Sequence, residues 1–217
     1  MSPRLYDYWR SSAAYRVRIG FQLKGVAYDA APVNILPGKD EQFGDAYRAK
    51  NPLGRVPTLE TEQGAIGQSL SILEWLEEMH PAPSFYRGDA WTRAQIRAFA
   101  LTICCDIHPI DNLSVLGRLR GQFGADDAAI ASWYVHWIAI GFAALEAQLA
   151  KRPVTAFAFG DHPTLADICL VPQVANSRRY KMDLSPYPRL AAIDERARTH
   201  PAFIAAAPEQ QKDAVKS

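Results

Sequence analysis

Two adjacent serines, Ser11 and Ser12, follow Arg10 at the point where an alternating run of residues ends and a helical pattern begins. Residues 5–9 predict a strand and residues 13–24 predict a helix, because apolar side chains recur there at the matching periods. A hydroxyl group at such a junction lies beside backbone N–H groups and the positive end of a helix dipole. This position can hold an anion or lower the pKa of a thiol, although one of the two serines could simply cap the helix.

The overall composition is that of a globular protein with one large core or two modest ones. The chain has 217 residues, of which 48% are hydrophobic and 22% are charged, and its formal net charge is +1. Because the sequence contains no basic run, we expect no nucleic-acid partner and no anionic membrane surface. No uninterrupted apolar stretch approaches about 18 residues and the N-terminus has no signal-peptide core, so we expect a cytoplasmic protein that does not enter a membrane.

Three cysteines, Cys104, Cys105 and Cys169, lie in apolar helical patterns. They form no metal-ligand spacing, and adjacent cysteines are poorly placed for an ordinary disulfide. We therefore expect buried, unbridged thiols in a reducing cytoplasm. The five histidines form no ligand pair and the sequence has no glycine-rich phosphate loop, so it predicts neither a metal site nor a nucleotide site.

The order of the predicted elements divides the chain into an α/β part and an all-α part. Residues 1–80 give the order strand, helix, strand, loop, strand, strand, helix, and residues 81–89 break every period and form a linker. Residues 90–217 are helical, and Pro109 is expected to kink the first long helix. The other predicted elements are strands at 27–34, from 56 onward and at 65–67, a short helix at 45–48, and helices at 69–76, 90–122, 126–150, 164–176 and 189–199.

Short local signals mark several ends of these elements. Gly25 predicts a left-handed C-cap for the first helix, and Ser69 could cap the helix that follows it. Thr164 with an acid three residues later, Asp167, has the form of a capping box. Pro57 enters a strand, where a proline must lie at an edge or in a turn.

Taken together, several of these residues form a known pattern. The chain resembles the zeta class of the glutathione transferase superfamily over nearly its whole length. The residues that carry the resemblance, in this order, are Arg10-Ser11-Ser12, Arg16-Val17-Arg18-Ile19, Asn51-Pro52, Val56-Pro57-Thr58-Leu59, Gln68-Ser69 and Thr164-Leu165-Ala166-Asp167. The members that it most resembles are maleylacetoacetate isomerases and bacterial maleylpyruvate isomerases, which share the runs Cys105-Asp106-Ile107-His108-Pro109-Ile110 and Val171-Pro172-Gln173-Val174-Ala175.

The resemblance implies a glutathione transferase fold, with a thioredoxin-like N-terminal domain, an all-α C-terminal domain, glutathione bound in the cleft between them, and a homodimer. The positions that match the family's glutathione contacts are Gln42, Val56, Pro57, Gln68, Ser69, His108 and Asn112. In this frame Pro57 is a cis proline, and Val56 pairs its backbone with the cysteinyl group as a strand accepts an added strand. Ser69 offers a hydroxyl and helix N-terminal N–H groups to the γ-glutamyl carboxylate. His108 could equally be a structural residue.

The reaction that the resemblance implies is the glutathione-dependent cis–trans isomerisation of maleylacetoacetate, by thiolate addition, bond rotation and elimination. Ser12 is expected to activate the thiol, whereas Ser11 is expected to cap the helix or to orient Arg10. Arg10 and Arg179 are expected to bind the carboxylates of a small dicarboxylate substrate, because a guanidinium can bind a carboxylate through two hydrogen bonds.

The chain departs from the family pattern where a cysteine and a tryptophan are replaced by Ala13 and Tyr15. Three interpretations therefore stay open. The protein could be a maleylacetoacetate isomerase of aromatic amino-acid catabolism, a maleylpyruvate isomerase of gentisate degradation, or a glutathione- or ligand-binding protein with weak transferase activity. We interpret Arg16 and Arg18 as surface or interface cations without a catalytic role.

Overall fold

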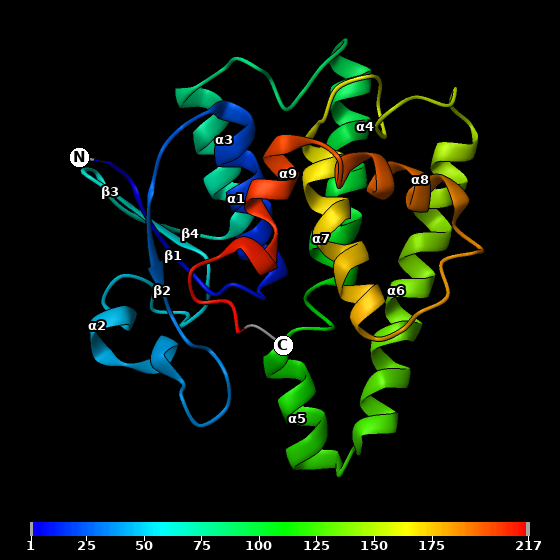
Figure 1. The fold of residues 1–217 in the computed structure, drawn as a ribbon. Coiled ribbons are helices and arrows are strands. Elements are labelled where there is room, and N and C mark those ends of the chain that lie inside the picture. Colours follow the sequence, from blue (N-terminus) through cyan, green and yellow to red (C-terminus); the bar gives the residue numbers. More distant parts are fainter. Residues whose placement is uncertain (1, 216–217) are drawn as a thin grey trace. The chain divides into compact units, whose positions relative to one another are not determined.

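The computed structural model describes residues 2–215, which form two compact units (Figure 1). The first unit comprises the residues up to Ser84 together with those from Thr199 onward, and the second runs from Phe85 to Arg198. The sequence-based division placed all residues after the linker in one helical domain. The grouping of the C-terminal segment with the first unit is a feature that the sequence pattern does not indicate.

The first unit is built on a mixed sheet of four strands in the order β2-β1-β3-β4. The strands are β1 (Arg4–Asp7), β2 (Asp29–Pro32), β3 (Thr58–Thr61) and β4 (Gly64–Gly67). β2 runs parallel to β1, whereas β3 is antiparallel to β1 and β4 is antiparallel to β3. The predicted α/β architecture of the N-terminal part is confirmed, and β1 and β3 lie at the centre of the sheet.

Helix α1 (Ser12–Lys24) begins within one residue of the predicted position and ends at it. Ser11 is its N-cap, and the Ser11 hydroxyl accepts a hydrogen bond from the Ala14 N–H at 3.2 Å. Gly25 ends the helix with φ +64°, a left-handed conformation that glycine adopts without steric cost. Every residue from Ser12 to Phe21 is buried, so α1 is the central helix of this unit rather than an amphipathic surface helix.

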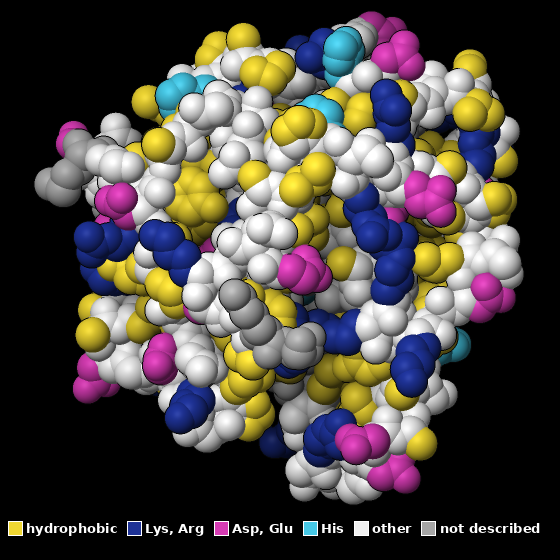
Figure 2. All heavy atoms as spheres, viewed as in Figure 1, with side chains coloured by type: hydrophobic (Ala, Val, Ile, Leu, Met, Phe, Trp, Pro, Cys, Tyr) yellow, Lys and Arg dark blue, Asp and Glu magenta, His cyan; other side chains and the backbone are white. Residues whose placement is uncertain are grey.

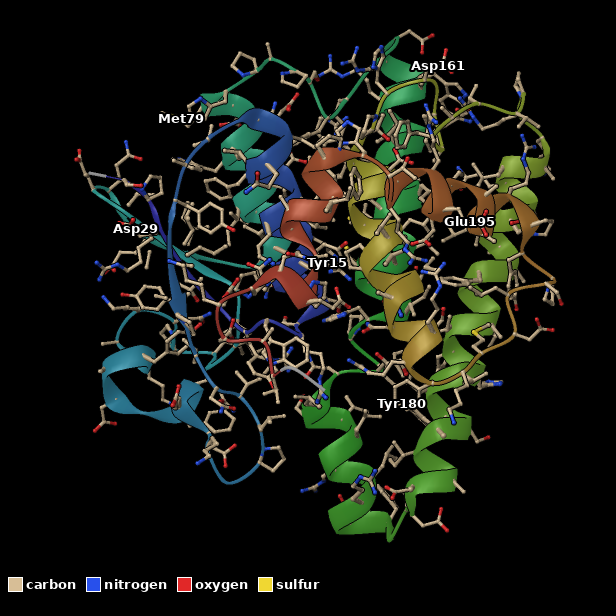
Figure 3. All side chains as sticks on the ribbon, viewed as in Figure 1. Tyr15, Asp29, Met79, Asp161, Tyr180 and Glu195 are labelled. Carbon is tan, nitrogen blue, oxygen red and sulfur yellow. The ribbon has the colours of Figure 1, made fainter. Side chains whose placement is uncertain are left out.

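The C-terminal segment packs on α1 through α9 (Pro201–Ala206). Tyr15, labelled in Figure 3, donates its hydroxyl to the Phe203 carbonyl at 3.4 Å. Arg18 Nε donates to the Ala206 carbonyl at 3.0 Å. These bonds join residues about 190 positions apart in the chain, which is why a local sequence pattern could not predict them.

The remaining elements of the first unit are short, apart from α3. The short helix α2 (Asp45–Arg48) has the bounds that the sequence predicts, and it follows a 3₁₀ turn, η1 (Glu41–Phe43). A second 3₁₀ turn, η3 (Pro208–Gln210), follows α9. Helix α3 (Ser69–Met79) packs against α1, so the two helices form one layer beside the sheet (Figure 1).

The second unit is helical, as predicted. Its elements are α4 (Ala90–Leu101), the π-helical segment η2 (Thr102–Ile107), α5 (Leu113–Phe123), α6 (Asp127–Ala150), α7 (Leu165–Arg179) and α8 (Pro188–Ala197). Helix α7 packs against α4 and α8, and α6 packs against η2 and α8 (Figure 1). All residues of α7 from Leu165 to Val174 are buried, so α7 is the central helix of this unit.

The first long helical pattern is interrupted rather than kinked, which corrects the expectation for Pro109. Helix α4 ends at Leu101, and the π-helical segment carries the chain to Ile107. The His108 N–H then donates to the Ile103 carbonyl at 2.9 Å, a π-helical hydrogen bond between residues five apart. His108 is the residue before the proline. Because Pro109 has no N–H, the chain leaves the helix there and a separate helix, α5, starts at Leu113.

The capping box predicted at the start of α7 is confirmed. Asp167 accepts hydrogen bonds from the Thr164 N–H at 2.8 Å and from the Ala158 N–H at 2.8 Å. The carboxyl group is fully buried, and burial raises its pKa to about 6 although these bonds oppose the shift. The box therefore fixes both the helix start and the preceding loop.

Helix α6 qualifies the expectation of no membrane-length segment. Among the described residues it is the one helix that is long and apolar enough to cross a membrane, by length and composition alone. In the structure one row of its side chains is buried in the core of the second unit. This row contains Ile130, Tyr134, Ile138, Phe142, Leu145 and Leu149.

None of the three cysteines forms a disulfide. Cys169 is buried, Cys104 is half-buried and lies with its Sγ 3.6 Å from the Cys169 Sγ, and Cys105 is exposed. The prediction of unbridged thiols is confirmed, whereas the prediction of burial is wrong for Cys105. Adjacent residues of a helical segment point in different directions around its axis, so one of the pair faces solvent.

The surface carries charges of both signs. Figure 2 shows Lys and Arg side chains interspersed with Asp and Glu side chains on the face that it draws. This mixture agrees with a formal net charge of +1.

Candidate active site

The start of α1 gives the two serines different environments. Ser11 lies outside the helix with φ −68° and ψ 119°, and its hydroxyl is engaged in the cap. Ser12 is the first helical residue and is 7% exposed. It lies within the first turn, where the positive end of the helix dipole favours a negative charge. The prediction that Ser11 caps the helix is confirmed, and Ser12 remains the candidate for activating a thiol.

The residues around the serines are an exposed cation, Arg10, and packed apolar groups. Arg10 is exposed, with its guanidinium carbon 5.8 Å from the centroid of the Trp9 ring, within the range of cation–π attraction. Ala13 is 9% exposed and Tyr15 is 5% exposed. Ala13 and Tyr15, the two positions that depart from the family pattern, are therefore core side chains. The exposed cation nearest to Ser12 along the chain is Arg10.

The two other arginines of this stretch are buried, which corrects their interpretation as surface cations. Arg18 is 0% exposed and completes its bonding with Asp7 at 2.9 Å and with the Trp9 carbonyl at 2.9 Å. Arg16 is 2% exposed and, among the described residues, donates only a long bond, from Nη1 to the Ser69 Oγ at 3.4 Å. The burial of both arginines was missed in the sequence analysis. The sequence did carry a signal for it, since apolar residues occur on all sides of α1 around both arginines.

Helix α3 begins at a strained residue. Its N-cap is Gln68, with φ +66°, and no side chain supplies a capping bond. The expectation that Ser69 caps α3 is therefore wrong, because Ser69 is already the first helical residue, where it is 7% exposed. A non-glycine residue with positive φ costs free energy and is typical of binding sites. The result is a helix N-terminus whose first N–H groups no side chain of the N-cap occupies.

The peptide bond between Val56 and Pro57 is cis, which confirms the prediction for Pro57. Asn51 stabilises the loop that leads to this bond. Asn51 Nδ2 donates to the Arg55 carbonyl and to the Thr58 Oγ1, both at 2.9 Å. Val56 is half-buried, and within residues 2–215 its N–H and carbonyl take part in no backbone–backbone hydrogen bond. This backbone can pair with an added extended peptide.

Gln42 lies in η1 with its side chain turned inward. It is 6% exposed, and its Nε2 lies 3.5 Å from Asp40 Oδ1, at the limit of a hydrogen bond. Its carboxamide oxygen is buried and has no partner among the described residues. An acceptor in this state is costly unless a ligand or a water molecule bonds to it.

In the second unit, the end of α7 separates the roles of its two arginines. Arg178 forms an ion pair with Asp194. Arg179 instead lies with its Nη2 3.4 Å from the Tyr134 hydroxyl and its guanidinium carbon 5.5 Å from the centroid of the Tyr180 ring. The rings of Tyr134 and Tyr180 stack at 3.9 Å, and Figure 3 labels Tyr180 at the end of this helix. Arg179 is exposed and has no acidic partner within residues 2–215, so it can bind a carboxylate.

Asp111 is a buried acid that the sequence analysis missed. It is 6% exposed, and neither carboxylate oxygen has a partner among the described residues. Burial raises its pKa to about 7, and its charge acts on Tyr134, whose pKa burial also raises. A buried acid of this kind can exchange a proton near neutral pH. The sequence gives no signal for it, because burial depends on the packing of η2 and α6.

His108 and Asn112 lie on the turn between η2 and α5, and both are half-buried. Asn112 is the N-cap of α5, and its side-chain oxygen accepts from the Ser114 N–H at 3.1 Å. This cap alone explains the residue type. Contact of His108 or Asn112 with a ligand stays a prediction.

The polar groups of the first unit fit a tripeptide with a carboxylate at one end. Two buried nitrogens of Arg16, Nε and Nη2, and the buried oxygen of Gln42 lack partners within residues 2–215. The uncapped start of α3 adds donors suited to a carboxylate, and the Val56 backbone suits an extended peptide. The described residues contain no group of three or more His, Cys, Asp or Glu side chains placed to hold a metal ion.

Comparison with known proteins gives the same family for both units. Residues 5–84 match the model of the glutathione S-transferase N-terminal domain, and residues 138–193 match that of the C-terminal domain. A maleylpyruvate isomerase of Ralstonia sp is 47% identical over 98% of this chain and 100% of its own length.

Solved structures agree with this assignment. A maleylpyruvate isomerase described as a bacterial zeta-class glutathione S-transferase superimposes with a TM-score of 0.95, at 46% identity over 98% of this chain and 100% of its own. A maleylacetoacetate isomerase from Anaeromyxobacter dehalogenans, solved with glutathione in its active site, gives a TM-score of 0.87 at 44% identity over 99% of this chain and 98% of its own. The chain therefore belongs to the zeta class of the glutathione S-transferase family.

Proposed function

We propose that this protein is a glutathione-dependent cis–trans isomerase that acts on maleylacetoacetate, in the catabolism of tyrosine and phenylalanine. The observation that carries the proposal is the division of roles at the start of α1. Ser11 caps the helix, so Ser12, buried in the first turn, is not needed for that task. A hydroxyl in this place can donate to a thiolate at a helix N-terminus.

Glutathione supplies a thiolate that adds reversibly to the conjugated double bond, so that the bond can rotate. The first unit would hold it through Val56, Pro57, Gln68, Ser69 and Gln42. Ser12 would donate a hydrogen bond to the sulfur and, together with the helix dipole, would favour the thiolate by about one pKa unit. Because a thiol has a pKa of about 8.5 in water, this shift raises the thiolate fraction near neutral pH.

The substrate carries two carboxylates, and arginine is the side chain best suited to them. Arg10 and, from the second unit, Arg179 would bind these groups. Arg178 is not a candidate, since Asp194 already neutralises it. A guanidinium placed beside the substrate would also stabilise the negative charge that develops on its carbonyl oxygen.

A second substrate, maleylpyruvate, is favoured by one observation: the relative that is 47% identical carries the name of that isomerase. The two substrates differ in the group beyond the reacting bond, and the residues named above bind what they share. Side-by-side assays with both substrates, each with and without glutathione, decide between them. Turnover of either substrate without glutathione would contradict the proposal.

A different class of function, a glutathione- or ligand-binding protein with weak transferase activity, predicts another result. It would bind glutathione in calorimetry in the sub-millimolar to millimolar range but isomerise neither substrate. An isomerase would bind glutathione in the same range and turn over one of them at a rate typical of enzymes, about 1–1,000 per second. If calorimetry detects no binding heat at several millimolar glutathione, both the isomerase and the glutathione-binding protein are rejected.

The proposal extends to assembly and location. We propose a homodimer in the cytoplasm, as expected from the superfamily and from the frequency of twofold symmetry among oligomers. Light scattering at micromolar concentration would give twice the chain mass of 24.1 kDa. A mass equal to that of one chain would contradict the dimer without affecting the proposed reaction.

A further inference from the structure

Arg16 is a buried cation whose bonding is incomplete. Its guanidinium has five N–H donors. Nη1 reaches the Ser69 Oγ at 3.4 Å, and Nε and Nη2 are buried without a partner in the described chain. No acidic side chain within residues 2–215 forms an ion pair with it. A buried charge without a partner destabilises a fold unless something neutralises it.

Arg18, two residues further along the same helix, shows what a completed site looks like here. Each of its three nitrogens has a partner at 2.9–3.0 Å, and one of these partners is the carboxylate of Asp7. The two arginines are equally buried, at 2% and 0% exposed. The difference between them is therefore a missing carboxylate and missing acceptors at Arg16, not a difference in burial.

The surroundings of Arg16 indicate what supplies that carboxylate. Its one bond leads to Ser69, the first residue of α3, where Gln68 provides no side-chain cap. A helix N-terminus favours an anion, and the Arg16 guanidinium beside Ser69 adds a full positive charge, with its Nε and Nη2 nitrogens without partners in the described chain. A carboxylate bound at Ser69 would be neutralised by Arg16 and would also receive N–H groups of the helix.

We propose that Arg16 is the buried counter-charge for the α-carboxylate of the γ-glutamyl group of glutathione, acting as a positioning residue through Ser69. The inference rests on the proposed function, since it assumes that glutathione is the ligand. It assigns to Arg16 a role in recognising one end of the tripeptide, remote from the sulfur. Replacing Arg16 therefore weakens binding of the tripeptide and leaves the titration of its bound thiol unchanged.

The test is a cycle of two proteins and two ligands, measured by isothermal titration calorimetry. The ligands are glutathione and 4-aminobutanoyl-cysteinyl-glycine, which has a hydrogen atom in place of the α-carboxylate. The wild-type protein is expected to bind glutathione about 10- to 100-fold more tightly than the analogue, because hydrogen bonds to charged groups are the strong ones. Arg16→Gln is expected to bind glutathione as weakly as the wild-type protein binds the analogue, and to bind the analogue with unchanged affinity.

Several outcomes would overturn the inference. Equal affinities of the wild-type protein for the two ligands would do so without any variant, and this arm of the test does not depend on whether Arg16→Gln folds. An equal loss for both ligands in Arg16→Gln would indicate a purely structural role. No binding of glutathione by the wild-type protein would instead reject the proposed function, and so the two failures can be told apart.

Discussion

The Asp7 carboxylate and the Arg18 guanidinium form an ion pair closed to solvent, with side chains 2% and 0% exposed and Oδ2 2.9 Å from Nη1. Burial raises the pKa of Asp7 although the charge of Arg18 lowers it. Arg18 also bonds to the carbonyls of Trp9 and Ala206, so one side chain joins the residues after β1, α1 and the C-terminal segment. The buried charge is therefore compensated, because each of the three guanidinium nitrogens has a hydrogen-bond partner and one partner is a carboxylate.

Removing one member of this pair is expected to destabilise the protein strongly. Arg18→Met leaves the Asp7 carboxylate buried and unpaired and should lower the free energy of unfolding by about 3–5 kcal/mol. Urea denaturation measures this loss. Arg120→Met is the matched control, because Arg120 pairs with Asp127 while their side chains are 46% and 95% exposed, and an exposed pair contributes at most about 1 kcal/mol. Equal losses in the two variants would contradict this account of burial.

The local signals in the sequence predicted local structure well, and the failures concern partners far apart in the chain. The cap at Ser11, the end at Gly25 and the capping box at Thr164 each depend on a few neighbouring residues, whereas the cis bond before Pro57 was implied by the resemblance to the family. The environment of Arg18 does not, since two of its acceptors come from β1 and from α9. A pattern of residue types shows that α1 is buried, but it does not show which acceptors meet its arginines.

The candidate site divides in the same way. The resemblance to the family points to the serines and to the residues at the start of α3, because their motifs are contiguous in the sequence, and their roles in binding and catalysis stay predictions. Asp111 was not found, because its importance comes from burial without a partner, which the packing of the helices determines. The exchange of roles at α3, where Gln68 takes the N-cap position instead of Ser69, depends on a backbone angle that the residue types do not reveal.

The two serines are expected to respond differently to truncation. Ser12→Ala should raise the pKa of the bound glutathione thiol toward its value in water and lower turnover at neutral pH about 10- to 100-fold, because a donor to a thiolate is lost. Ser11→Ala should lower stability by about 1 kcal/mol through the lost cap, with little change in the thiol. The ultraviolet absorbance of the bound thiolate against pH measures the first effect. A shift of that titration in Ser11→Ala alone would reverse the two roles.

Asp111 is expected to make stability depend on pH. Its pKa is raised to about 7 in the folded protein from an ordinary value near 3.8. Between these values the folded state holds a proton that the unfolded chain has released, so the free energy of unfolding falls as pH rises from about 4 to about 7 and is level beyond. The Asp111→Asn variant has no such proton and should lose this part of the pH dependence.

The variant is therefore expected to match the wild-type protein near pH 4 and to exceed its stability at pH 8 by about 2–4 kcal/mol. Urea denaturation at a series of pH values gives the difference curve. Asp167, whose pKa is also raised, is present in both proteins and cancels in that curve. A difference that stays constant between pH 4 and pH 8 would show that the Asp111 carboxyl does not titrate in this range.

Gly141 is expected to be required for the packing of α6 against η2. A Cβ atom built at Gly141 would lie 2.2 Å from Cδ1 and 2.5 Å from Cγ1 of Ile107, which is 1% exposed. Alanine favours a helix by about 1 kcal/mol over glycine, but the clash displaces a side chain that is closely packed. Gly141→Ala should therefore lower the free energy of unfolding, by about 1–3 kcal/mol, as overpacking of a core does.

Two further variants make this prediction specific. Gly117 lies in α5 with nothing within 4 Å of a built Cβ atom, so Gly117→Ala should raise stability by up to about 1 kcal/mol through helix propensity alone. Ile107→Ala removes the group that clashes and costs about 2–5 kcal/mol on its own through the cavity it leaves. In the double variant the new methyl group of Gly141→Ala fills part of that cavity, so the combined loss should be smaller than the sum of the two single losses. Additive losses would show that the two positions do not contact each other as described, and a stabilising Gly141→Ala would show that α6 and η2 have room to separate.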